Sequence, residues 1–183
     1  HLSIRRQRQM CIRDSHIPVH LGAMGVFTRS LMKEFPQLSK GDILVANHPG
    51  FGGSHLPDIS VLAPVFGKSE EPVCFVANRA HHAEIGGASP GSMPAGSATL
   101  EQEGVVLYPQ YLFEKGESRM DQIKKILQQA KCPSRQVSDN LADLSAQVAS
   151  LRYGVDAMEH LLVEYGEDAV SYTHLRAHET SLH

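Results

Sequence analysis

Residues 47–91 read NHPGFGGSHLPDISVLAPVFGKSEEPVCFVANRAHHAEIGGASPG, and the fold of the chain follows from this stretch. Two apolar runs, Ile59–Phe66 and Val73–Ala77, flank a short charged turn and predict the paired strands of a β-hairpin. In an antiparallel pair, the start of one strand lies beside the end of the other. We therefore expect the side chains at those two ends to lie close together.

The two ends that this hairpin joins carry metal-binding side chains. His55 and Asp58 form an HxxD pair before the first strand, and His81 and His82 follow the second. Two imidazoles and one carboxylate, with coordination positions left open, suit a catalytic Mn, Zn or Fe ion, which can polarise a carbonyl group. An HxxD pair has a plainer interpretation, because loops often hold Asp as a turn cap and His as a surface residue. The pattern leaves open whether His81 or His82 is the third ligand.

A helix and a short strand are expected before the hairpin. Residues 16–25, HIPVHLGAMG, suit an extended segment that opens a helix over Val26–Phe35. Ile43–Ala46 reads as a buried strand that delivers Asn47 into a glycine-rich loop, where site residues commonly lie. His20 is another candidate for the site, and its alternative role is hydrogen-bonded packing.

More helix is expected after the hairpin. Residues 85–98 are rich in Gly and Pro, which predicts either an ordered loop that uses its backbone amides or a mobile linker. Val105–Phe113 is strand-like, and Ser118–Ala130 has one apolar helical face. Residues 138–140 are expected to cap a longer helix whose apolar stripe forms core or a partner interface.

The composition indicates a globular chain, and the expected elements indicate an α+β fold with central strands, glycine-rich loops and flanking helices. Its 183 residues are 42% hydrophobic and 20% charged, with a net charge of −3, which gives no electrostatic case for nucleic acid or membrane binding. Three cysteines without paired spacing indicate a reducing compartment such as the cytoplasm. The sequence has no P-loop, no GxSxG elbow and no dinucleotide-binding glycine pattern after a strand, so a nucleotide site is not expected.

Both ends of the chain read as translated sequencing adapter. Met10–Asp14 matches the translation of ATG TGT ATA AGA GAC, and Val170–Glu179 matches the reverse complement of the partner adapter. We therefore expect residues 1–15 and 170–183 to be adapter-derived tails, and residues 16–169 to be an internal fragment of a larger subunit. The alternative is a basic arm and a His-rich tail. Other codons at these positions in the encoding DNA would contradict the adapter interpretation.

Five segments together resemble the hydantoinase B/oxoprolinase family. They are HIPVHLG (16–22), GDILVANHPGFGGSHLPDISVLAPVF (41–66), VANRAHHAEIGGASPGSMPAGS (76–97), TLEQEGV (99–105) and SDNLADLSAQVASLRYG (138–154). NHP with GGSHLPD and LEQEG looks most like the 5-oxoprolinase branch. Two positions depart from the common pattern: Glu84 stands where the family often has Asp, and His48 where many members outside that branch have Asp.

The resemblance implies a cytoplasmic, oligomeric hydrolase subunit that opens a small cyclic amide, 5-oxoproline or a hydantoin. It implies a hydantoinase A-type partner that binds ATP with Mg and phosphorylates the substrate, and a divalent metal held by this component. The alternatives are a subunit of an acetone- or acetophenone-type carboxylase and a non-catalytic assembly module. A fragment of this size is expected to be inactive alone.

Residue roles also follow from the resemblance. The metal ligands of the carboxylase members fall on His55, Asp58 and His81, with His82 as the alternative to His81. His82, His20 and Asn47 then line the site as candidate acid, base or orienting groups.

Overall fold

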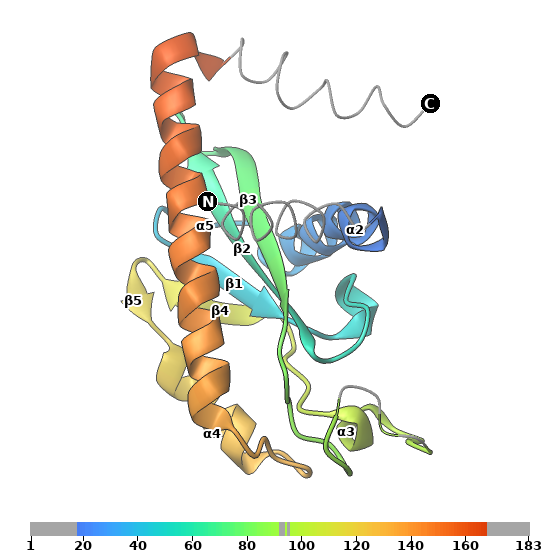
Figure 1. Ribbon diagram of the computed structural model, residues 1–183. Helices are drawn as coiled ribbons and strands as arrows, with labels where there is room; N and C mark the ends of the chain where they lie inside the picture. Colours follow the sequence, from blue (N-terminus) through green and yellow to red (C-terminus); the bar gives the residue numbers. More distant parts are fainter. Residues whose placement is uncertain (1–17, 92–93, 95, 168–183) are drawn as a thin grey trace, which may run out of the picture.

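The computed structural model describes residues 18–91, 94 and 96–167, which form one antiparallel sheet with helices on both faces (Figure 1). In sheet order the strands are β3 (Pro72–His81), β2 (Asp58–Phe66), β1 (Ile43–Ala46), β4 (Gln110–Glu114) and β5 (Glu117–Ser118). The helices are α2 (Pro18–Glu34), α3 (Leu100–Glu103), α4 (Met120–Gln129) and α5 (Val137–Tyr165), with a short 3-10 turn η1 (Pro49–Phe51). The expected α+β class is confirmed.

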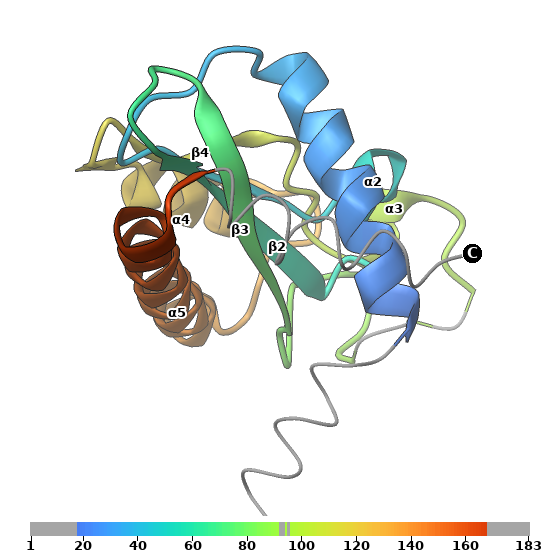
Figure 2. The same ribbon diagram turned by 90° about the horizontal axis from the view of Figure 1, so that it is seen from above.

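The sheet separates two hydrophobic cores, because side chains alternate between the faces of a strand. In β1, Ile43 and Val45 pack into the core beneath α4 and α5, while Leu44 and Ala46 pack against α2. Figure 2 shows α5 and α2 on opposite sides of the sheet. All four residues of β1 are buried for this reason, which explains why the strand is a continuous apolar run rather than an alternating one.

Helix α2 begins earlier than the sequence predicted. The extended segment expected over residues 16–25 is wrong from Pro18 onward, since a proline in the first helical turn lacks only an N–H that would have no partner there. The expected apolar face is confirmed, because Phe27 and Leu31 are fully buried against the sheet. The helix ends at Glu34, before Pro36.

Helix α5 confirms the expected apolar stripe but not the expected cap. Leu144, Val148 and Leu151 lie in the core between α5 and the sheet. The helix packs across strands β2 and β3 (Figure 1). Its N-cap residue is Gln136, without a side-chain cap bond, while Asn140 lies inside the helix and is buried. Although α5 is long, no helix within the described ranges combines the length and hydrophobicity needed to cross a membrane.

The strand predicted over Val105–Phe113 is wrong in its first half, since β4 starts only at Gln110. The backbone before it is satisfied elsewhere: the N–H of Val105 donates to the Ile85 carbonyl at 2.7 Å, and that of Leu107 donates to the Asn47 side chain at 2.7 Å. Pro109 also has no N–H to offer to a ladder.

Gly52, at the end of η1, permits the close approach of the glycine-rich loop to α2. Its φ is +87°, and a Cβ there would lie 2.6 Å from the Phe27 backbone nitrogen. We expect Gly52→Ala to lower the free energy of unfolding by about 2 kcal/mol or more, because positive φ and a backbone clash add. Gly22→Ala is the matched control, since nothing lies within 4 Å of its Cβ position. Because Gly22 is exposed in a helix, Gly22→Ala should raise the free energy of unfolding by up to about 1 kcal/mol. Equal urea midpoints for the two variants would contradict this prediction.

Candidate metal centre

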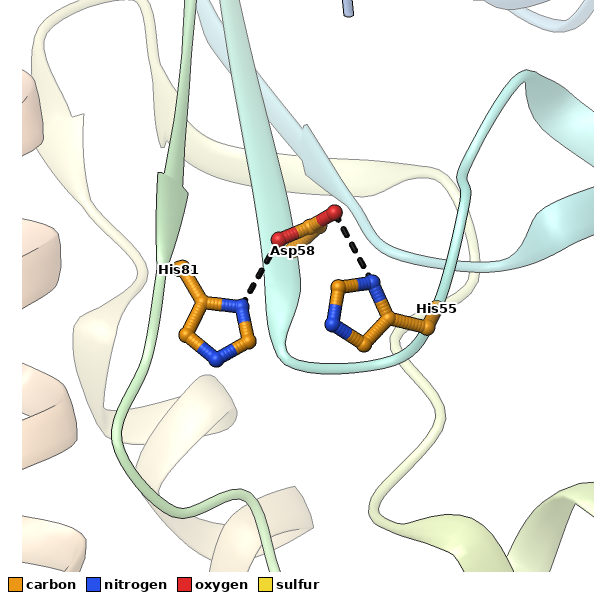
Figure 3. A group of neighbouring side chains, drawn as sticks. All are labelled: His55, Asp58 and His81. Carbon is orange, nitrogen blue, oxygen red and sulfur yellow. Dashed lines mark hydrogen bonds and ion pairs between the residues drawn. The ribbon is translucent and has the colours of Figure 1, made fainter. Parts of the chain in front are cut away.

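The hairpin brings His55, Asp58 and His81 into one cluster (Figure 3). Nδ1 of His55 lies 2.9 Å from one carboxylate oxygen of Asp58, and Nδ1 of His81 lies 3.0 Å from the other. The two imidazole rings lie on the same side of the carboxylate, with their centroids 4.9 Å apart. The juxtaposition predicted from antiparallel pairing is therefore present.

Local structure explains how each member of the cluster is placed. Asp58 opens β2 and pairs directly with His81, the last residue of β3. The N–H of Asp58 donates to the His55 carbonyl at 2.9 Å, which closes the HLPD turn. Leu56 and Pro57 inside that turn are buried, so the turn is packed against the protein and not free in solvent. The HxxD spacing thus places both side chains on one side of a tight turn.

The donor set fits a divalent cation. One ligand atom from each residue can be chosen so that all three lie within 4.8 Å of one another. Ligand atoms at about 2.0–2.2 Å from a shared ion also lie within this limit of one another, so the spacing of the three groups is compatible with one ion. The Asp58 side chain is 3% exposed while that of His81 is 49% exposed, which leaves one side of the cluster open to solvent. Two imidazoles and one carboxylate are a set that Zn, Mn and Fe accept.

Two further polar side chains, Ser54 and Arg79, act on the surroundings of the buried carboxylate. The Ser54 hydroxyl donates a hydrogen bond to Asp58. Arg79, two residues before His81 on the same face of β3, donates to the Ser60 hydroxyl and to the Gly52 carbonyl, each at 2.7 Å. Burial lowers the pKa of the Arg79 guanidinium, and the negative charge of Asp58 opposes this effect. Arg79 thus places positive charge near the cluster and ties β3 to the glycine-rich loop.

His82 does not join the cluster, because it follows His81 and points to the opposite face of the sheet. Its side chain is fully buried under α5, where Nδ1 contacts the Asn140 amide oxygen at 2.7 Å and Nε2 contacts the Gln147 amide oxygen at 3.2 Å. Between the two ligands left open by the sequence, the cluster contains His81. An acid–base role for His82 stays a prediction.

Asn47 connects three backbone segments. Its amide nitrogen donates to the carbonyls of Leu56 and Val105, at 2.7 and 2.9 Å, and its oxygen accepts the N–H of Leu107. Because Asn47 is buried with these partners, it holds the turn that carries His55 and Asp58. Its predicted role as a catalytic or orienting group at the substrate is not tested.

The structure describes His48 in full but only the backbone of His20. His20 falls in the first turns of α2, and its side chain lies outside the described part, so its predicted site role stays open. The His48 ring stacks on Tyr108, with centroids 4.8 Å apart, and its Nδ1 accepts the N–H of Gly50. In its neutral form the ring therefore carries its hydrogen on Nε2.

Glu84, which the sequence marked only as a departure from the family pattern, connects several segments through hydrogen bonds to its carboxylate. It accepts hydrogen bonds from the Ser134 hydroxyl, the backbone N–H groups of Gly86 and Arg135, and the Arg135 guanidinium. Burial raises the pKa of the Glu84 carboxyl, but these hydrogen bonds outweigh it, so the pKa lies below its ordinary value. These bonds connect the first part of the glycine-rich loop to the segment that precedes α5, which supports the ordered-loop interpretation for residues 85–91.

The depressed pKa of Glu84 makes its contribution to stability dependent on pH. Such a group stabilises the fold above its unfolded-state pKa, and the stabilisation is lost as pH falls through the folded-state pKa. We expect Glu84→Gln to unfold more readily than the wild type at pH 7, by on the order of 1 kcal/mol. The difference should shrink as pH falls below about 4. Urea melts at several pH values measure it, and a difference that stays constant with pH would contradict the assignment.

Comparison with known proteins agrees with this architecture. The family model for hydantoinase B/oxoprolinase matches residues 3–181. The chain belongs to this family. In sequence it is 44% identical over 177 residues to 5-oxoprolinase 1 of Arabidopsis thaliana, a match that covers 90% of the chain but 14% of that relative. The chain thus spans about a seventh of that relative's length. The expected family is confirmed.

Two solved structures share the fold of this hydantoinase B family chain. The ATP-dependent caprolactamase from Pseudomonas jessenii superposes with a TM-score of 0.72 at 28% identity, covering 90% of the chain and 27% of that protein. An acetone carboxylase, solved without nucleotide, gives a TM-score of 0.73 at 21% identity, covering 82% of the chain and 20% of that protein. The second likeness concerns the fold alone. In both, the matched region is a minor part of a larger protein.

Proposed function

We propose that this chain is part of an ATP-dependent cyclic-amide hydrolase, in which it contributes a divalent metal site to the ring opening of 5-oxoproline or a related cyclic amide. The observation that carries the proposal is the cluster of His55, Asp58 and His81, two imidazoles about one buried carboxylate at 2.9 and 3.0 Å. Family membership adds support, because relatives that are 38–44% identical are named 5-oxoprolinases.

A Mn, Zn or Fe ion held by these three side chains would supply Lewis acidity toward a substrate carbonyl. The chain's own residues do the rest of the positioning. His55 and His81 would bind the ion through ring nitrogens, and the Ser54 hydroxyl would hold the carboxylate of Asp58 in place. Arg79 adds positive charge that favours an anionic substrate or intermediate near the cluster.

ATP with Mg is proposed to bind a hydantoinase A-type partner, not this chain. Support comes from relatives: the caprolactamase of similar fold is described as ATP-dependent, and a 29% identical relative is named as the β subunit of a caprolactamase. A subunit so named implies a second component in that enzyme. We extend this to a cytoplasmic, multi-component assembly around the present chain, which by itself would be inactive.

A substrate panel tests the reaction class. The whole subunit that contains this chain, combined with its ATP-binding partner, would be given ATP with 5-oxoproline, N-methylhydantoin, or acetone plus bicarbonate. The proposal expects ADP formation coupled to glutamate release from 5-oxoproline, and little product from the ketone. Carboxylation of the ketone without amide hydrolysis would favour a carboxylase instead. No turnover with any substrate, by an assembly that still binds metal, would favour the assembly-module alternative.

A further inference from the structure

A buried network joins α5 to the end of the strand that carries His81. The two ring nitrogens of His82 lie 2.7 and 3.2 Å from the amide oxygens of Asn140 and Gln147, and its backbone N–H donates to the Pro57 carbonyl at 2.8 Å. Pro57 directly precedes Asp58. One residue therefore links α5 to both ends of the hairpin that form the candidate metal centre.

The two amides cannot turn freely. The amide nitrogen of Asn140 donates to the Glu84 carbonyl at 2.8 Å and to the Ser134 hydroxyl at 2.9 Å. These bonds fix its oxygen toward His82. Asn140 is thus held by residues on both sides of the glycine-rich loop, and not only by its own helix.

Gln147 is fixed in the same way from the other side. Its amide nitrogen donates to the Ile59 carbonyl and to the Asn78 side chain, both at 3.0 Å, while the Asn78 amide donates to the Gln147 carbonyl at 2.9 Å. Ile59 lies in β2 and Asn78 in β3, so Gln147 bonds to both strands of the hairpin. Asn140 and Gln147 are seven residues apart, which places them on one face of the helix, two turns from each other.

The end of β3 has a specific need for such support. β3 is the edge of the sheet, and His81 is its last residue, with a half-exposed ring. Strand ends at a sheet edge fray, because they lack a second neighbour. A frayed end would let His81 move away from Asp58. Ordering that end again on binding would cost free energy, which would lower the affinity for any ligand that both residues share.

We propose that Asn140 and Gln147, acting through His82, are positioning residues that hold the end of β3 so that His81 faces Asp58. We call Asn140, Gln147 and His82 the clamp: they lie on the α5 face of the sheet, whereas the cluster that they support lies on the α2 face. The functional role of the clamp rests on the proposed metal site. Partners behind the ligand shell commonly change metal affinity by about 10–100-fold when removed. Because this clamp acts one residue away from His81, we expect the low end of that range.

The test compares Gln147→Met with Val148→Ala in the full chain. Methionine keeps the length of the side chain but removes its contact with His82 and its hydrogen bonds to Ile59 and Asn78. Val148, the next residue of α5, is a buried apolar side chain of the core. Two quantities are measured in each protein: Co²⁺ affinity with its absorption spectrum, and the hydrogen-exchange rate of the His82 amide without metal. Asn140→Leu, which removes the contact at the other ring nitrogen, replaces Gln147→Met if that variant does not fold.

The clamp predicts Co²⁺ binding about tenfold weaker in Gln147→Met, with an altered spectrum, and faster exchange at His82. Val148→Ala should lower the melting temperature yet keep wild-type affinity and wild-type His82 exchange. Equal His82 exchange in the two variants overturns the clamp, as does an equal loss of affinity. If the wild type binds no Co²⁺, the metal reading of the proposed function fails by itself, and the exchange rates alone decide whether Gln147 holds the strand end.

Discussion

Asp58→Asn is expected to weaken divalent metal binding by at least about 100-fold. The substitution keeps the shape of the side chain but removes the negative charge that faces two imidazoles at 2.9 and 3.0 Å. A neutral amide offers one weak oxygen ligand in place of a charged carboxylate. Isothermal titration with Mn²⁺ and Zn²⁺ on the wild type and the variant measures the loss.

Asp42→Asn is the matched control for this prediction. Asp42 is also a buried carboxylate at 3% exposure, and it accepts backbone hydrogen bonds from Ser39 and Lys115 at 2.6 Å each. Its replacement should lower stability, because charged hydrogen bonds contribute about 1.5–3 kcal/mol each, and should leave metal affinity unchanged. Comparable metal binding by Asp58→Asn and the wild type would exclude Asp58 as a ligand.

His81→Ala is expected to lower kcat/KM for ring opening by about 10³-fold or more in the reconstituted enzyme, which corresponds to about 4 kcal/mol of transition-state stabilisation. Stability should change little, since half of the His81 side chain is exposed and its ring pairs with Asp58 at the protein surface. Coupled assays of ADP and glutamate release, together with melting curves, measure the two quantities.

The control for His81 is another exposed histidine. His160 lies on the outer side of α5, where its ring contacts the backbone carbonyl of Asp156 at 2.8 Å. His160→Ala should keep wild-type turnover. A loss of less than tenfold in His81→Ala, or an equal loss in both variants, would show that this imidazole does not take part in the reaction.

The hairpin was predictable because its signals are local. Two apolar runs around a short turn predicted the pairing of β2 with β3, and antiparallel pairing placed His55 and Asp58 beside the pair His81 and His82. The choice between the two adjacent histidines needed the strand register, which the structure supplies. Residues 81 and 82 must point to opposite faces, and Asp58 pairs with His81.

The clamp on His82 was not predictable, because its partners lie 58 and 65 residues away in sequence. In the sequence, Asn140 has the appearance of a helix cap, since Ser, Asp and Asn favour that position. Its burial inside α5 is a tertiary effect that no local pattern records. The same reason explains the missed role of Asn47, whose side chain takes the place of a strand neighbour for Leu107.

Metal analysis of the whole subunit that contains this chain is the most direct test of the His55–Asp58–His81 centre. Wild type, His55→Ala and Asp58→Ala would be purified alike, dialysed, and measured by inductively coupled plasma mass spectrometry. We predict about one Mn, Zn or Fe ion per wild-type chain and almost none in either variant. Equal metal in all three proteins, or none in any, would contradict the assignment of the cluster as a metal centre.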